Sequence, residues 1–206
     1  MKKSIKICVL FVLLITIGSA FKSIVINPEL EIGAKTPMTD TKMMDVSGKD
    51  VSLSTVKGEN GLLVIFSCNT CPYVKLSESR IKEVSAHAKR NSIGLILVNS
   101  NEAQRSNEDS FEAMKKYAAE QEYDFSYVVD KNSVLANAFG ATRTPHCFLF
   151  DKNDALVYRG AIDDNIKDQN AVKENFLVNA IIATAAGRSL KTNSTKSVGC
   201  SIKRME

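Results

Sequence analysis

Two cysteines separated by two residues, Cys68 and Cys71, stand where a buried strand gives way to a helix. The run from Leu62 to Phe66 is continuously apolar, which predicts a strand buried on both faces. Pro72 follows the second cysteine and suits the first turn of a helix. This context favours a redox pair over a structural disulfide or a zinc half-site, since a structural zinc usually needs four ligands.

The start of a helix changes the chemistry of a thiol. Unpaired backbone N–H groups and the positive end of the helix dipole stabilise a thiolate. We therefore predict that Cys68 is the acidified nucleophile, with a pKa below that of a free thiol. Cys71 lies one helical turn later, close enough to resolve a mixed disulfide.

Strands alternate with helices along the rest of the chain. Polar and apolar residues alternate on either side of the turn at 47–50, which predicts a hairpin over 45–57. The later expected strands are 62–66, 93–98, 125–129, 146–150 and 155–159. Four helices are expected. The first begins at Pro72 and the second after a capping box at Ser106–Asp109. The third begins at Ser133 and ends at Gly140, and the fourth begins at Val172 and ends at Gly187. This order predicts a largely parallel sheet covered on both faces, with an antiparallel edge formed by the last two strands.

The first twenty residues predict an export signal. Lys2, Lys3 and Lys6 precede a short apolar run, and 18–20 are small residues of the kind a signal peptidase reads. We expect cleavage before Phe21, which would remove Cys8 and leave no stable membrane span. An uncleaved anchor is the alternative. Three of the 27 Lys and Arg residues lie in this signal, so 24 remain against 23 Asp and Glu, a balance that does not support nucleic-acid binding.

The segment FSCNTCPYV, together with TPHCFLF further along, resembles the thioredoxin superfamily. The order of elements is similar to its redoxin branch, the alkyl hydroperoxide reductase/thiol-specific antioxidant (AhpC/TSA)-like proteins. The resemblance implies a three-layer α/β/α thioredoxin-like fold with a mixed central sheet over residues 33–188. A tether at 21–32 would precede that domain, and a tail at 189–206, loosely ordered except near Cys200, would follow it.

The resemblance also implies a docking loop beside the two cysteines. In that family a cis-proline packs against the C-x-x-C, and the matching residues here are Thr144 and Pro145. Thr144 would present its backbone to a substrate chain. The alternative is an ordinary proline at the start of a strand.

Two positions depart from the family patterns. Many thioredoxins carry a buried carboxylate six residues before the first cysteine, where this chain has Leu62. Typical peroxiredoxins carry Thr or Ser three residues before the peroxidatic cysteine, where this chain has Ile65 before Cys68. These differences argue against a specialised peroxide pocket.

The remaining candidate residues permit several roles. Cys147 lies in an apolar run and is expected to be a small buried hydrophobe. The tail VGCSIK resembles those of exported redoxins, so Cys200 is a third redox thiol, a partner for Cys147, or an unpaired surface thiol. His146 with two thiols would suit Cu(I) or Zn. Asp163 and Asp164 are expected to be solvated or to cap the chain.

These features together predict an extracytoplasmic, periplasmic thiol–disulfide oxidoreductase without a cofactor. Cys68 would attack, Cys71 would resolve, and Thr144 and Pro145 would position protein thiols or disulfides. A further, unidentified redox partner is implied. The alternatives are a thiol peroxidase of the AhpC/TSA type and a copper or zinc chaperone that uses the same cysteines.

Overall fold

The computed structural model describes residues 28–205. The predicted signal peptide, Cys8 and the expected mature start at Phe21 lie outside the described residues, as does most of the tether. Among the described residues, no helix is both long enough and apolar enough to span a bilayer.

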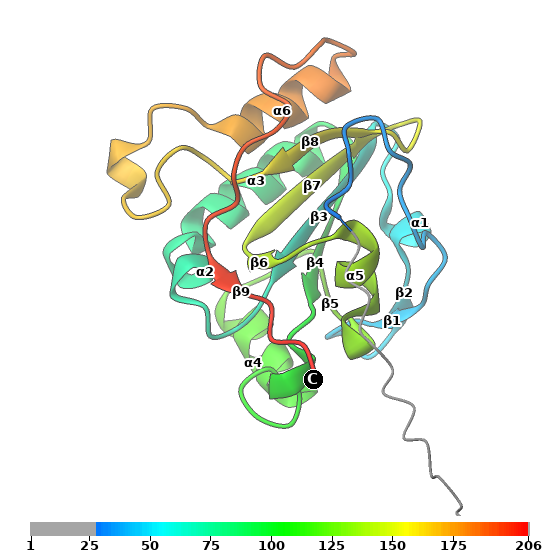
Figure 1. The fold of residues 1–206 in the computed structure, drawn as a ribbon, viewed down its shortest axis with the longest axis vertical. Coiled ribbons are helices and arrows are strands. Elements are labelled where there is room, and N and C mark those ends of the chain that lie inside the picture. Colours follow the sequence, from blue (N-terminus) through cyan, green and yellow to red (C-terminus); the bar gives the residue numbers. More distant parts are fainter. Residues whose placement is uncertain (1–27, 206) are drawn as a thin grey trace, which may run out of the picture.

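A five-stranded sheet forms the centre of the molecule (Figure 1). Its strands are β3 (Gly61–Ser67), β4 (Ile93–Asn99), β5 (Ser126–Val129), β7 (His146–Asp151) and β8 (Leu156–Gly160), in the order β5-β4-β3-β7-β8. β3 and β5 run parallel to β4, whereas β7 is antiparallel to both β3 and β8. The mixed sheet is therefore confirmed. The sheet is less parallel than the alternation predicts, because β7 also runs against β3.

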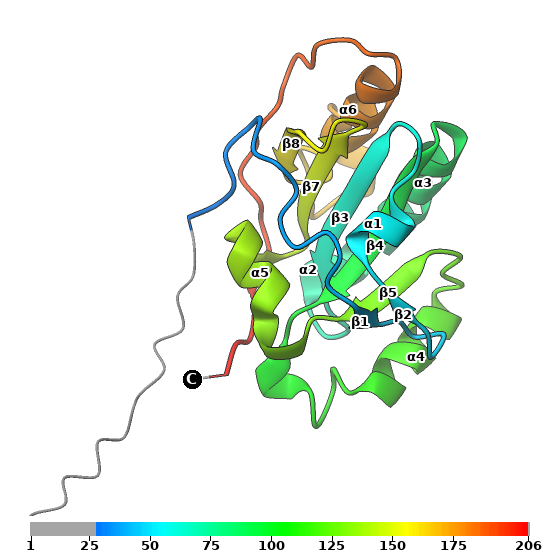
Figure 2. The same cartoon turned by 90° about the vertical axis from the view of Figure 1, so that its right-hand side faces the viewer.

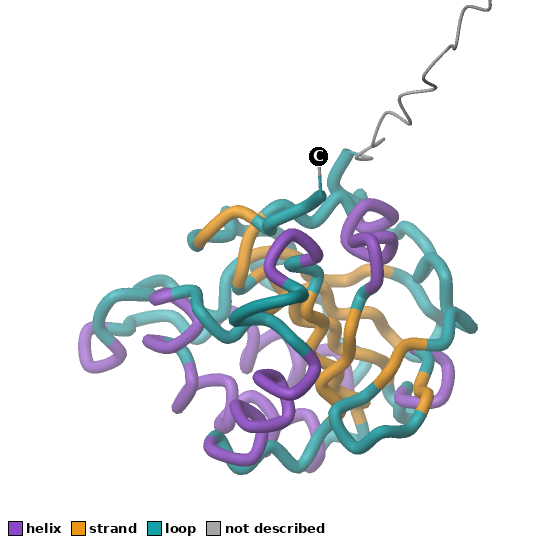
Figure 3. Tube along the Cα trace, turned by 90° about the horizontal axis from the view of Figure 1, so that it is seen from below, coloured by secondary structure: helices purple, strands orange, loops and turns teal. Residues whose placement is uncertain are grey.

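Helices cover both faces of the sheet, which confirms the three-layer architecture (Figures 2 and 3). Successive residues of β3 point to opposite faces, as the strand period requires: Leu63 and Ile65 belong to one apolar cluster, and Leu62 and Val64 to another. The first cluster lies under α3 (Glu78–Arg90), α4 (Phe111–Glu120) and α6 (Phe176–Ala185). The second lies under α1 (Leu53–Val56) and α5 (Val134–Phe139).

Several boundaries differ from the sequence predictions. The capping box at Ser106 is wrong: α4 begins at Phe111, because the Ser110 side chain accepts from the Ala113 N–H. The expected hairpin over 45–57 consists of two short strands, β1 (Met43–Met44) and β2 (Asp50–Val51), followed directly by α1. α6 begins at Phe176 rather than at 172. Gly140 ends α5 as predicted, with a φ of 64° that suits glycine.

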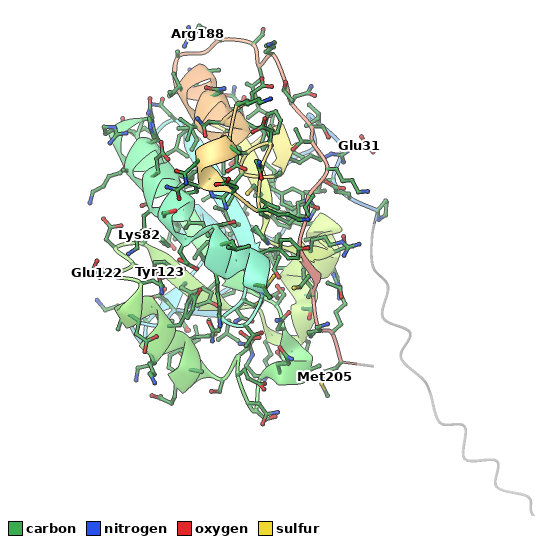
Figure 4. All side chains as sticks on the ribbon, turned by 90° about the vertical axis from the view of Figure 1, so that its left-hand side faces the viewer. Glu31, Lys82, Glu122, Tyr123, Arg188 and Met205 are labelled. Carbon is green, nitrogen blue, oxygen red and sulfur yellow. The ribbon has the colours of Figure 1, made fainter. Side chains whose placement is uncertain are left out.

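The C-terminal segment is docked not only near Cys200, which the sequence analysis excepts from the loose tail, but also before it, where the sequence predicts loose order. Figure 4 shows this segment running along the molecule between the labelled Arg188 and Met205. It passes the β8 edge, where the Thr195 N–H donates to the Arg159 carbonyl over 3.0 Å. It then forms β9 (Cys200–Ser201), which pairs antiparallel with β6 (Arg143–Thr144).

Candidate active site

The two cysteines lie at the carboxyl end of β3, where the sheet meets α2 (Pro72–Leu76). Cys68 follows the last residue of β3, and Cys71 is the N-cap of α2. Both are free thiols, and they are only 1% and 2% exposed. The predicted helix start at Pro72 is confirmed, but it places Cys71 rather than Cys68 at the N-terminal end of the helix, and neither sulfur lies open to solvent.

The predicted docking loop lies against this pair. The Thr144–Pro145 peptide bond is cis. The Cys71 thiol donates to the Thr144 carbonyl oxygen over 3.0 Å, and Cys68 Sγ lies 3.5 Å from Thr144 Oγ1. The structure thus brings together all four residues for which the sequence predicts catalysis or substrate binding.

Cys200 joins this site through β9. Its partner in the β6–β9 ladder is Thr144, and its side chain packs against the cluster of Cys68, Cys71 and Val74. Cys200 also contributes to lowering the pKa of Cys71. Cys147 belongs to a different cluster and is fully buried, as predicted. Of the two redox roles that the sequence offers for Cys200, the structure therefore favours the one at the C-x-x-C.

Contacts among these sulfur atoms separate the pKa values of the pair. The pKa of Cys71 is lowered, chiefly by the neighbouring Cys68 thiol and to a smaller extent by Cys200 and the Thr144 hydroxyl, against the opposing effect of burial. The pKa of Cys68 is raised, first by the same contact with Cys71 and then by burial. The Thr144 carbonyl acts in the opposite sense, because it accepts only from a protonated Cys71.

The predicted lower pKa at Cys68 is therefore wrong for the state in which β9 is docked. The physical reason is position. The helix begins after Cys71 rather than after Cys68, and Cys200 contributes to lowering the pKa of Cys71.

A buried carboxylate, which the sequence analysis did not identify, supports the loop between the cysteines. Asp109 is fully buried and accepts from the Asn69 N–H (2.9 Å), Asn99 Nδ2 (2.8 Å) and Asn101 Nδ2 (2.9 Å). The Tyr127 hydroxyl donates to the Asn69 side chain over 2.9 Å. This network fixes the backbone between Cys68 and Cys71. Asp109 stands in a loop just before α4, and nothing local distinguishes it from a helix-capping residue.

Other predicted residues lie away from the thiols. His146 is buried, and its Nε2 lies 3.1 Å from a carboxylate oxygen of Glu29. Within residues 28–205, no three His, Cys, Asp or Glu side chains are grouped so that they could hold a metal ion. Asp164 is exposed as expected, whereas Asp163 is buried and paired with Arg80 over 2.7 Å.

The residues that depart from the family patterns both belong to the core. Ile65 is fully buried in the cluster under α3 and α6, so its side chain serves the packing of the sheet. Leu62 is buried on the opposite face. No hydroxyl stands three residues before Cys68, and no acid stands six residues before it.

Comparison with known proteins agrees with this geometry. The redoxin family model matches residues 31–175. None of the curated proteins matches the chain. A hypothetical protein from Sinorhizobium meliloti is 29% identical, with a TM-score of 0.78 and coverage of 86% of this chain and 96% of that one. An uncharacterized conserved protein from Geobacillus kaustophilus is 32% identical, with a TM-score of 0.79 and coverage of 85% and 93%.

More distant structures share the fold alone. The peroxidoxin BcpB from Mycobacterium tuberculosis is 12% identical, with a TM-score of 0.59 and coverage of 77% of this chain and 98% of that one. A secreted disulfide oxidoreductase from the same organism is 11% identical, with a TM-score of 0.54 and coverage of 70% and 96%.

Proposed function

Since the chain belongs to the redoxin family of thioredoxin-like oxidoreductases, we propose that it is an extracytoplasmic thiol–disulfide oxidoreductase whose redox centre is the Cys68–Cys71 pair. One observation carries the proposal: two thiols packed in one buried cluster at the start of a helix, with the Thr144 carbonyl 3.0 Å from Cys71 Sγ. Disulfide exchange requires a thiolate, a second thiol to resolve the mixed disulfide, and an edge that positions the partner chain.

In this proposal Cys68 attacks the substrate disulfide and Cys71 resolves the mixed species. Displacement of β9 from Thr144 would shift the balance toward these roles. Cys71 then loses the contribution of Cys200 and keeps the Thr144 carbonyl, which favours its protonated form. Cys68 keeps the Cys71 N–H and the Thr144 hydroxyl as donors, and both stabilise its thiolate. A partner chain that replaces β9 on Thr144 would therefore meet a nucleophilic Cys68.

Peroxide reduction is the competing function within this family. It requires donors that polarise the O–O bond and stabilise the leaving oxygen as charge develops. Ile65 cannot supply such a donor, because its side chain forms no hydrogen bonds and is buried in the core. This absence at position 65 favours disulfide exchange over peroxide reduction. We therefore expect thiol exchange to outpace peroxidase chemistry.

The test compares two substrates on the same reduced protein. The protein should reduce a model disulfide rapidly, whereas stopped-flow oxidation by hydrogen peroxide should match that of an ordinary low-pKa thiol. If oxidation by peroxide were orders of magnitude faster than for a free thiolate, and were lost in Cys68→Ser, the function would be that of a peroxidase.

The proposed location outside the cytoplasm rests on the residues before Phe21. A positive start, a short apolar run and small residues at 18–20 form the pattern of a cleaved signal. N-terminal sequencing of exported protein is expected to begin at Phe21. A mature chain that retained Met1 and fractionated with membranes would contradict this.

A further inference from the structure

We propose that Cys200 is a third redox thiol of this site, carried on a strand that occupies the substrate edge, and that it exchanges with the Cys68–Cys71 disulfide at Cys71. The proposal rests on the proposed function, because that disulfide is its starting point. In this proposal the C-terminal strand β9 binds the edge at which a substrate protein would bind and presents its own cysteine there.

The first support is the strand pairing. β9 is antiparallel to β6, with Cys200 opposite Thr144 and Ser201 opposite Arg143. Thr144 is also the residue proposed to pair with the backbone of a substrate protein. Figure 1 shows β9 beside β6, so the chain's own strand lies where a bound substrate strand would lie, with Cys200 opposite Thr144.

The second support is that the segment is shaped to dock at this place. A Cβ on Gly199 would lie 2.1 Å from the Thr144 carbonyl oxygen, so only glycine permits this approach. Arg143 Nη1 donates to the Gly199 carbonyl over 3.1 Å. Ile202 is buried in the apolar cluster under α1 and α5, and the Lys203 N–H donates to Asn101 Oδ1 over 2.9 Å.

The third support is the placement of the three thiols. Cys200 stands opposite Thr144 in the β6–β9 ladder, and the Thr144 carbonyl oxygen lies 3.0 Å from Cys71 Sγ, so the strand pairing directs Cys200 toward Cys71. Cys200 is half-buried, whereas Cys68 and Cys71 are 1% and 2% exposed. Cys200 is therefore the one thiol of the three that an external thiol reaches without displacement of β9.

The step itself needs no added reagent. Starting from the Cys68–Cys71 disulfide, the Cys200 thiolate attacks Cys71 Sγ, the bond between Cys68 and Cys71 breaks, and a Cys71–Cys200 disulfide forms. Cys68 leaves as a thiolate and takes up the proton that Cys200 released. Cys200 is oxidised and Cys68 reduced, so the disulfide moves from a covered position to an accessible one, and Cys68 is regenerated as a thiol.

Two single variants distinguish this arrangement from mere flexibility of the tail. Treated with oxidised glutathione and mapped under non-reducing conditions, Cys68→Ser should form an intramolecular Cys71–Cys200 disulfide. Cys71→Ser should instead accumulate mixed disulfides with glutathione, since the pairing of Cys200 with Thr144 directs its thiol toward Cys71 rather than Cys68. Cys147→Ala, which removes a buried thiol outside the site, should change neither result.

Gly199→Ala provides a variant that keeps all three thiols. Its methyl group should push β9 off Thr144, and in a Cys68→Ser background it should lower the rate of Cys71–Cys200 formation by about tenfold or more, equivalent to about 1.4 kcal/mol of docking free energy. The Cys68–Cys71 disulfide should still form when Gly199→Ala is placed in the otherwise native chain. An unchanged rate in the double variant would overturn the docking argument.

The outcomes separate the two proposals. If the native chain forms the Cys68–Cys71 disulfide and reduces a model disulfide, but Cys68→Ser yields no Cys71–Cys200 link, the role of Cys200 is refuted and the proposed function stands. If the native chain forms no Cys68–Cys71 disulfide, the proposed function fails, and this inference fails with it.

Discussion

Replacing Cys68 with serine is expected to reduce the rate of model-disulfide reduction by about a thousandfold or more, because the attacking sulfur is lost. Cys71→Ser should fail in a different way. It should react once and then stop, leaving a mixed disulfide between Cys68 and the substrate, since the resolving thiol is absent. Turnover assays together with mass spectrometry of the stalled protein would measure both effects.

The control for these variants is Cys147→Ala. Cys147 is fully buried, and burial raises the pKa of its thiol, so it should contribute nothing to exchange. Comparable activity in Cys68→Ser and the native chain would show that the reactive thiol lies elsewhere. A Cys71→Ser variant that turned over normally would remove the resolving role.

Asp163→Asn is expected to destabilise the fold by about 3–5 kcal/mol, because it leaves a buried guanidinium without its counter-charge. Arg80 Nη1 lies 2.7 Å from Asp163 Oδ2, and the two side chains are 6% and 1% exposed. Arg80 also donates to the carbonyls of Leu76, Asn165 and Ile166, so it fastens the loop before α6 to the start of α3. Thermal unfolding should show a midpoint lower by roughly 10 °C.

The neighbouring Asp164 provides the matched control. It is exposed and accepts from the Lys173 N–H, so Asp164→Asn should have a much smaller effect on the midpoint. Replacing Arg80 and Asp163 together with apolar residues should recover part of the loss, since the cost arises from an unpaired charge. Equal destabilisation by the Asp163 and Asp164 variants would show that the ion pair contributes little.

The parts of the site that local patterns encode could be predicted. The apolar run before Cys68 predicts a buried strand, Pro72 predicts the helix start, and the resemblance supplies the cis bond at Thr144–Pro145. Each of these signals lies within a few residues of the feature it predicts. The three-layer fold follows for the same reason, since it depends on the order of strands and helices.

The parts that depend on distant contacts could not be predicted. Asp109 lies 40 residues from Asn69 in the chain, and its neighbouring residues indicate only a helix-capping role. Arg80 and Asp163 are 83 residues apart in the chain. Because no neighbouring residue indicates the pairing, the sequence predicts only a solvated loop residue at Asp163. The reversal of the pKa order between Cys68 and Cys71 depends chiefly on how the two thiols face each other, and to a smaller extent on Cys200, whose docking beside Thr144 no local pattern encodes.

The most direct test of the central claim is a glutathione redox titration of Cys200→Ser, in which Cys68 and Cys71 are the only thiols left at the site. The account predicts one reversible two-electron transition that links these two residues, with about 30 mV for each tenfold change in the ratio of the two forms. Peptide mapping should find Cys147 as a free thiol throughout. If Cys68 and Cys71 instead persist as separate thiols or separate glutathione adducts across the titration, they are not a redox pair.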